Sequence, residues 1–300
     1  GLKEDESTGL ESLIVLSYDH GNLSEVQQYS LRAAEQGRTA SPAITMYMLA
    51  HTGCCLAEIG RDMIRAESLL LEAQFISDRL GIPASDIPFG LGCVRRFQGH
   101  IDEARSLLRQ GWHMAQMAQD HWRECLCLTN LVMLELETGN PTTALNDSNE
   151  LIYVSAQMGG GSEAPHAAAL DAVTRYMLQE NNAADSLARS LQVLRQIDSP
   201  RMLACIQTIA AQWDLLQGNW QQSVARAEEA WVAAQLISNP SAIALAGSVI
   251  IQANHQRGHL DCAQRHLAAL KTQIKGHALS TQAHRRMTDL HALLNQSIHP

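Results

Sequence analysis

A glycine-centred turn that returns at nearly constant spacing is the feature that most constrains how this chain folds. Each turn separates two segments of helical character, and the clearest example is Gly99-His100 within residues 89–108. Related turns contain Gly21, Gly60, Gly139, Gly218 and Gly258. Successive intervals are 39, 39, 40, 79 and 40 residues, where 79 equals two periods with one glycine missing. A fixed period of this size is typical of a helical solenoid.

The segments between the turns have the composition and the spacing of helices. Ala, Leu, Gln, Glu and Arg, which are good helix formers, dominate. Apolar residues recur at helical intervals, as at Ala104, Leu107, Gly111, Met114 and Ala118, which we expect on one face. The fold class predicted is all-α: a right-handed superhelical solenoid of about seven antiparallel helix pairs plus a C-terminal capping helix. The helices are expected at 8–20, 23–36, 42–59, 63–80, 87–98, 102–119, 122–138, 141–158, 164–179, 183–197, 200–217, 221–237, 240–256, 261–275 and 281–296.

The chain divides into three predicted parts. Residues 1–7 form a polar, flexible leader, 8–278 form the repeat array, and 279–300 form the capping helix and tail. The glycine run at 159–162 interrupts the array and lacks the Lys-Ser/Thr pair of a phosphate-binding loop, so we interpret it as a flexible loop. In the fifth pair Asn181-Asn182 replace the turn glycine, because Asn tolerates the left-handed conformation.

Composition narrows the functional classes. The formal net charge of −9 and the lack of a Lys- or Arg-rich run argue against direct contact with nucleic acid. The longest apolar run, 242–251, is about half a membrane span, and no secretory signal is visible, so a cytoplasmic protein without membrane contact is expected. Seven cysteines without a CxxC pair favour reduced, structural thiols.

Catalytic and metal-binding patterns are missing from the sequence. It contains no HExxH, GxSxG or Walker motif, so we expect no enzymatic activity and no cofactor. His255 and His259 have the spacing of a helical metal pair, but Gly258 breaks the helix between them. His277, His284 and His291 repeat every seven residues, about 10.5 Å along a helix, too far apart to share one ion. We predict no metal site.

Small residues flank the turns and carry a resemblance to a known family. Gly or Ala beside a turn lets two helix axes approach closely. These positions are Thr52-Gly53, Gly60 and Ala66, then Leu91-Gly92, Gly99 and Ala104, and finally Gly139 and Ala144. The pattern resembles the tetratricopeptide repeat over almost the whole chain, although the period of 39–40 residues exceeds that family's usual ~34.

The long period and the degenerate motif carry a finer resemblance. Residues 96–104 and 119–122 are similar to segments in the repeat sensor domains of bacterial signalling ATPases and LuxR-type activators, including the maltose-regulon activator. The resemblance implies a protein-binding or regulatory domain of a bacterial signalling or transcription-regulating system. The nucleotide-binding motor and the DNA-binding helix-turn-helix of those regulators are not visible in this sequence.

The expected binding surface is the concave face, which the first helix of each pair lines. Arg95-Arg96 could hold a partner's carboxylate through bidentate bonds or form salt bridges to a neighbouring repeat. The five tryptophans are interpreted mainly as core residues between repeats. By register with the turns, the outward positions are Tyr47, Glu58, Phe89, Cys93, Arg96, Phe97, Met133, Glu137, Thr174, Met177, Gln212, Gln252 and His255.

These positions mix apolar and polar side chains without one dominant charge, as suits a peptide or a partner helix. We therefore predict a non-enzymatic protein–protein interaction scaffold or regulatory sensor domain that binds a partner protein or peptide in its groove. The alternative is a small-molecule effector-sensing domain of a larger transcriptional or signalling regulator.

Overall fold

All regular structure in the described residues is α-helical, which confirms the predicted all-α class. The structure is a computed structural model that describes residues 13–14 and 22–296, excluding the side chains of 295 and 296. The helices are α2 (Leu23–Gly37), α3 (Pro42–Ile59), α4 (Met63–Leu80), α5 (Asp86–Gln98), α6 (Ile101–Ala118), α7 (His121–Glu137), α8 (Pro141–Gln157), α9 (Glu163–Met177), α10 (Ala183–Gln196), α11 (Pro200–Leu216), α12 (Trp220–Leu236), α13 (Pro240–Gln256), α14 (Leu260–Ile274) and α15 (Thr281–Gln296). The predicted leader and the predicted helix at 8–20 lie outside the described residues, apart from 13–14.

The helix bounds follow local stop and start signals in the sequence. Helices α3, α8, α11 and α13 begin with proline, whose missing N–H costs nothing in a first turn. The turn glycines have positive φ, for example 70° at Gly60 and 81° at Gly99, a conformation that favours glycine. Asn182 takes the same left-handed conformation with φ of 61°, as predicted for the turn without glycine.

Small residues allow the close helix contacts that the sequence predicts. A Cβ atom added to Gly53 of α3 would lie 2.6 Å from Leu70 Cγ of α4. One added to Gly92 of α5 would lie 2.8 Å from Leu108 Cγ of α6. The pairs α3–α4 and α5–α6 therefore pack at a distance that only glycine permits at these two points.

The buried face of α6 differs from the predicted one. Ala104 and Gly111 are buried as expected, but the apolar positions between and beyond them are Leu108 and Ala115. The predicted residues Leu107 and Met114 are half-buried, and Ala118 is exposed. The helix is turned by one position, because the close approach of Leu108 to Gly92 determines which side faces α5.

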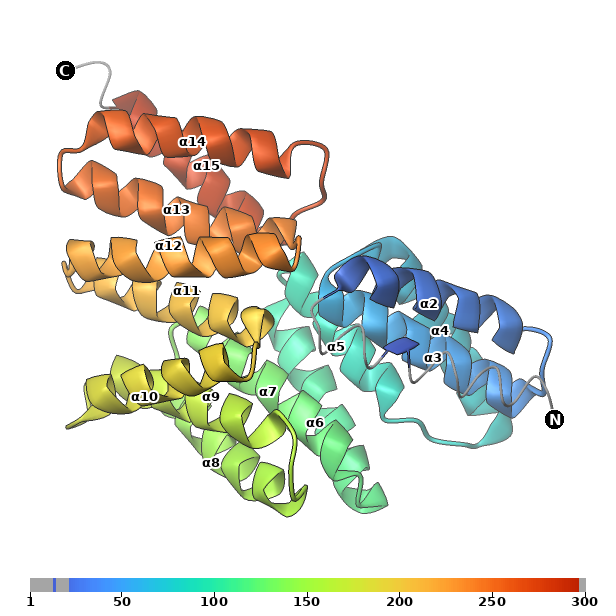
Figure 1. Ribbon diagram of the computed structural model, residues 1–300. Coiled ribbons are helices and arrows are strands. Elements are labelled where there is room, and N and C mark those ends of the chain that lie inside the picture. Colours follow the sequence, from blue (N-terminus) through green and yellow to red (C-terminus); the bar gives the residue numbers. More distant parts are fainter. Residues whose placement is uncertain (1–12, 15–21, 297–300) are drawn as a thin grey trace. The chain divides into compact units, whose positions relative to one another are not determined.

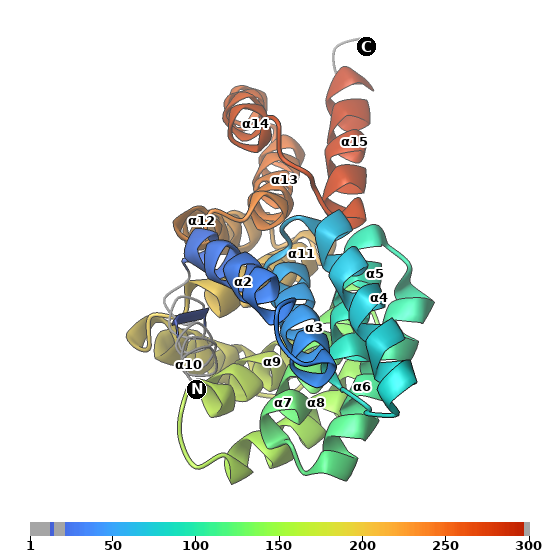
Figure 2. The ribbon, with the colours of Figure 1, turned by 90° about the vertical axis from the view of Figure 1, so that its right-hand side faces the viewer.

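The chain forms two compact units, 1–167 and 168–300. In the first unit α3, α5 and α7 pack in succession, and each also contacts its own second helix, α4, α6 or α8 (Figure 1). In the second unit α11, α12, α13 and α14 stack as successive layers, and α15 packs on α13 (Figures 1 and 2). The first helices are thus enclosed on several sides.

Helix α15, which the sequence predicts as the capping helix, is amphipathic. Ala283, Met287 and Leu290 are buried in the core of the second unit, together with residues of α13. Arg285 and Asp289 are exposed on the opposite side. A polar outer face of this kind allows a repeat array to end in water.

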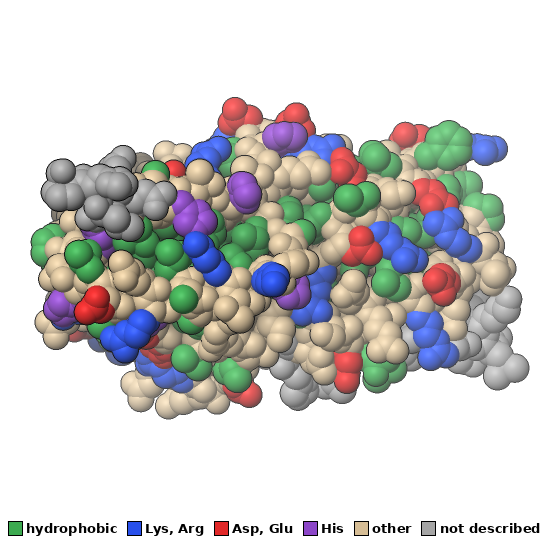
Figure 3. Space-filling model, turned by 90° about the horizontal axis from the view of Figure 1, so that it is seen from above, with side chains coloured by type: hydrophobic (Ala, Val, Ile, Leu, Met, Phe, Trp, Pro, Cys, Tyr) green, Lys and Arg blue, Asp and Glu red, His purple; other side chains and the backbone are tan. Residues whose placement is uncertain are grey.

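Charged side chains of both signs are interspersed on the face that Figure 3 shows, without a broad area of one charge. The charged surface residues that this view shows therefore do not form the continuous basic stripe that a phosphate backbone requires.

Among the described helices, none is long and apolar enough to cross a bilayer.

Candidate functional site

Five of the predicted groove residues lie in the core and correct the sequence-based assignment. Phe89 and Thr174 are fully buried, and Cys93, Met133 and Met177 are at most 7% exposed. The reason is the enclosure of the first helices: α7 buries almost every residue from Glu124 to Leu136. A first helix leaves only a narrow strip uncovered, so an error of one position moves a side chain into the core.

Arg95 and Arg96 bind carboxylates of the protein itself, which is the second of the two predicted alternatives. Arg96 of α5 donates to Glu137 of α7, with Nε–Oε2 of 3.0 Å, and to Asn130 Oδ1 at 3.0 Å. Arg95 bridges Glu67 and Glu103. The hydrogen bond from Arg95 holds the pKa of the Glu67 carboxyl below its usual range. Arg96 and Glu137 therefore join neighbouring repeats of the first unit.

The other predicted positions in the first unit are partly accessible. Tyr47 is 45% exposed and stacks on the ring of His51 at a centroid distance of 6.1 Å. Glu58 is half-buried, and Phe97 is half-buried against the core. These side chains lie on α3 and α5, and their role in binding stays a prediction.

In the second unit, Gln212 and Gln252, one 40-residue period apart, line the same pocket of about 360 Å³. His255, the remaining predicted position, is half-buried near the end of the same helix as Gln252. We call this pocket the amide pocket; its lining residues are Gln212, Leu215, Leu216, Trp220, Gln252, Gln256, Arg286 and Leu293. They come from α11, the start of α12, α13 and α15.

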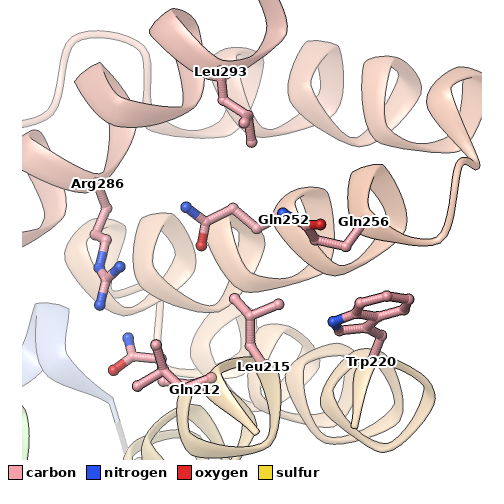
Figure 4. Close-up of a pocket in the computed structure, with 8 residues that line it drawn as sticks. Gln212, Leu215, Trp220, Gln252, Gln256, Arg286 and Leu293 are labelled. Atoms are coloured by element: carbon pink, nitrogen blue, oxygen red, sulfur yellow. The ribbon is translucent and has the colours of Figure 1, made fainter. Parts of the chain in front are cut away.

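The arrangement of the side chains in the amide pocket is visible in Figure 4. Leu215 points into the pocket from α11, and Leu293 points toward it from α15 on the opposite side. The side chains of Gln252 and Gln256 project from α13 between them, while Arg286 and Trp220 stand at the two ends of the group in this view. Apolar side chains thus face a set of amide, guanidinium and indole groups.

Helical spacing explains why these residues share one pocket. Gln252 and Gln256 are four residues apart on α13, so both point to one side of that helix. Gln212 and Leu216 occupy the equivalent positions on α11, 40 residues earlier. Two consecutive first helices therefore present corresponding side chains, and α15 supplies the third wall.

The polar groups of the amide pocket have no partners within the described part of the chain. The side chains of Gln212, Gln252, Gln256, Trp220 and Arg286 line the pocket and make no hydrogen bond or ion pair with a described residue. All five are half-buried or exposed, so water reaches them. Such groups are free to bond a ligand without first breaking an internal contact.

A second depression, of about 410 Å³, lies near the turns of α9 and α11. It differs from the amide pocket because several of its polar side chains are bound to other residues of the chain. Its Gln179 donates to Gln217 at 3.2 Å, and its Tyr176 donates to Asp214 Oδ1 at 2.6 Å. Its Glu180 is paired with Arg175. These polar groups are already satisfied, so this depression is a weaker candidate for ligand binding than the amide pocket.

The charges around α11 are also internally compensated. Asp214 is fully buried and forms an ion pair with Arg226 of α12, with Oδ2–Nε of 2.9 Å. Burial raises the pKa of the Asp214 carboxyl, while the hydrogen bond from Tyr176 and the charge of Arg226 act in the opposite direction. Because Asp214 is committed to this cluster, it is not available to neutralise a cation in the amide pocket.

Sequence reasoning predicted only Gln212 and Gln252 of the eight lining residues and missed Leu215, Leu216, Trp220, Gln256, Arg286 and Leu293. Arg286 and Leu293 lie in a helix for which the sequence predicted only a capping role. Of the five tryptophans interpreted as core residues, Trp231 is 8% exposed, whereas Trp122 and Trp220 are more than one third exposed. The available signal was the place of Trp220 directly after a turn, where the end of a helix is open to solvent.

The described residues offer no group of three His, Cys, Asp or Glu side chains placed to hold a metal ion. Burial raises the pKa of the Cys125 thiol to about 12, which keeps this thiol protonated and unreactive at neutral pH. The chemistry that the amide pocket offers is hydrogen bonding and apolar contact.

Comparison with known proteins places the fold. No protein-family model matches the sequence, and the search of curated proteins finds no match. The structure is similar to that of a Rap protein in complex with Competence and Sporulation Factor, with a TM-score of 0.60, 11% identity, and coverage of 98% of this chain and 88% of that one. A tetratricopeptide repeat protein from Parabacteroides merdae gives a TM-score of 0.53 and 13% identity, with 100% of both chains covered.

A thermophilic tetratricopeptide repeat protein from Thermus thermophilus is a third similar structure, with a TM-score of 0.47 and 19% identity over 72% of this chain and 99% of that chain. The first two similarities confirm the predicted tetratricopeptide-repeat-like helical fold. At these identities they show the fold alone.

Proposed function

We propose that this chain is a non-enzymatic interaction module that binds a partner protein or peptide in the amide pocket. The observation that carries the proposal is the set of five polar side chains in that pocket without partners among the described residues. An extended peptide segment presents main-chain N–H and C=O groups at regular intervals. Glutamine amides both donate and accept, so Gln212, Gln252 and Gln256 match such a main chain.

The apolar residues of the pocket suit the side chains of the same segment. Leu216 is 76% exposed and Trp220 is 38% exposed, an unfavourable arrangement in water that a bound apolar side chain would relieve. The fold itself is compatible with the proposal, since one structure that shares it is that of a Rap protein in complex with a factor. Aromatic side chains and arginine, here Trp220 and Arg286, are enriched in protein-binding surfaces.

We further propose the finer assignment that the sequence suggests. In it, residues 8–278 form the repeat array, 279–300 form the cap and tail, and the chain acts in the cytoplasm as the sensor region of a bacterial signalling or transcription-regulating protein. The resemblance to LuxR-type and maltose-activator sensor domains supports this assignment. The accessible residues Tyr47, Glu58, Phe97 and His255 are proposed as further contacts of a longer partner.

The alternative, binding of a small-molecule effector in the same pocket, is favoured by the pocket volume. A volume of about 360 Å³ is near the lower end of the range of small-molecule sites. The two alternatives differ in which ligand raises thermal stability. A small effector alone raises it if the pocket is an effector site, whereas only a peptide or protein raises it if the chain is a scaffold.

Selection from a displayed library of random 12-residue peptides on the immobilised full chain tests the proposal. We expect enriched peptides, and we expect Gln252→Ala to weaken their binding about 5- to 10-fold, because a hydrogen bond contributes roughly 1 kcal/mol. Gln222→Ala is the matched control, since Gln222 is exposed on α12 and does not line the pocket.

An absence of enriched peptides would argue against peptide binding. Equal binding by the wild type and Gln252→Ala would move the binding surface away from the amide pocket. Equal melting temperatures of the two variants show that any loss of binding is local.

A further inference from the structure

Arg286 is the one feature of the amide pocket that a neutral peptide main chain does not explain. Its guanidinium points into the pocket from α15, toward Gln212 (Figure 4). It is half-buried, and it forms no ion pair or hydrogen bond with any described residue. Among the described residues no carboxylate pairs with this partly withdrawn cation, so water alone solvates its charge.

Other arginines of the two units contrast with Arg286. Arg95, Arg105 and Arg109 in the first unit each bind a Glu or Asp side chain. Arg195 and Arg226 in the second unit do the same. These five arginines lie between helices and each has a carboxylate partner, whereas Arg286 faces a pocket and has none among the described residues.

The helices around the pocket do not supply a carboxylate. Helix α13 contains no Asp or Glu, and the only acidic residue of α11 is Asp214, which is buried and bound to Arg226 and Tyr176. On α15 the only acidic residue is Asp289, which is exposed and makes no ion pair with Arg286. Glu229 of α12 is bound to Arg195. Glu228 of α12 is exposed and forms no ion pair with Arg286. A ligand carboxylate would therefore meet Arg286 without displacing an internal partner.

We infer that the amide pocket selects peptides that carry a carboxylate, which binds the Arg286 guanidinium while the glutamine amides bind the adjoining main chain. This inference rests on the proposed peptide binding and adds the charge of the partner. The planar guanidinium offers parallel N–H donors that match the two oxygens of a carboxylate, and such charge-assisted pairs are stronger than neutral hydrogen bonds.

The amino-acid composition of the peptides enriched in the same selection tests the inference. Peptides enriched on the wild type should carry Asp, Glu or a free C-terminal carboxylate at one fixed position. Arg286→Gln should bind them about 10- to 100-fold more weakly, because a hydrogen bond to a charged group contributes more than a neutral one. Arg286→Glu should enrich Lys- or Arg-containing peptides instead.

Arg285→Gln is the matched control, because Arg285 is the exposed neighbour of Arg286 on the same helix and does not line the pocket. It removes the same charge from the molecule, so it should leave both affinity and peptide preference unchanged. Equal melting temperatures of all three variants and the wild type exclude a folding effect, as expected for side chains that are not in the core.

The possible failures are distinguishable. Enriched peptides without an acidic position, or with the same acidic preference in Arg286→Gln, overturn the carboxylate inference but leave peptide binding standing. If no peptide is enriched, both proposals fail. If glutarate raises the melting temperature of the wild type but not of Arg286→Gln while no peptide is enriched, the ligand is a small carboxylate and the peptide is overturned.

Discussion

At the scale of single residues, the contrast between paired and unpaired side chains separates structure from candidate function. Arg96 was expected to contact a partner, yet it binds Glu137 and Asn130 of its own chain. Gln252 was expected on the same grounds and has no partner among the described residues. The sequence pattern places both on first helices but does not contain the information about which neighbour lies opposite, because that depends on tertiary packing.

Glycines at helix contacts give a residue-scale prediction about stability. Gly53→Ala places a Cβ atom 2.6 Å from Leu70 Cγ, within a tightly packed core, so the helices must separate. We expect the free energy of unfolding to fall by about 1–3 kcal/mol in urea denaturation. Gly160→Ala is the control, because its Cβ meets nothing within 4 Å and its φ is not positive. A change of less than about 0.5 kcal/mol in both variants would contradict the close contact.

At the scale of elements, most helix bounds could be predicted from local signals. The predicted 42–59, 63–80 and 240–256 coincide with α3, α4 and α13, because proline and the residues around each turn determine where a helix begins and ends. The rotation of a helix about its axis was harder to predict, as α6 shows. It depends on contacts such as Leu108 against Gly92, which involve two helices at once.

Helix α15 is the element whose role was only half predicted. Its amphipathic pattern indicated a cap, and its buried face is that of a cap. Its contribution of Arg286 and Leu293 to the amide pocket was missed, since the sequence predicted only a capping role for this helix. The side of a terminal helix that borders its buried stripe still faces the preceding repeats.

Removal of a buried side chain tests the packing of α15. Leu290→Ala leaves a cavity in the core of the second unit, and we expect it to reduce the free energy of unfolding by about 2–5 kcal/mol. The exposed neighbour His291→Ala should change it by less than about 0.5 kcal/mol. Urea denaturation followed by circular dichroism measures both variants. A Leu290→Ala protein as stable as His291→Ala would mean that α15 does not close the core.

At the scale of the whole molecule, the net charge of the chain and the local charge of the amide pocket have opposite signs. The net charge is −9, yet the pocket contains a cation and no carboxylate among its lining residues. Composition indicated helices and an acidic chain but averaged over this local difference. The period predicted the helical repeat fold across the described residues, because each repeat packs mainly on its neighbours and local pattern then determines architecture.

The most direct test of the central claim is site-specific photocrosslinking of a selected peptide to the full chain. A photoreactive benzoylphenylalanine replaces Leu216, which lines the amide pocket, or Leu236, which is exposed to a similar extent on α12 and does not line it. Binding in the amide pocket predicts a crosslinked peptide from position 216 and none from position 236. Crosslinking from position 236 alone, or equally from both positions, would contradict the account.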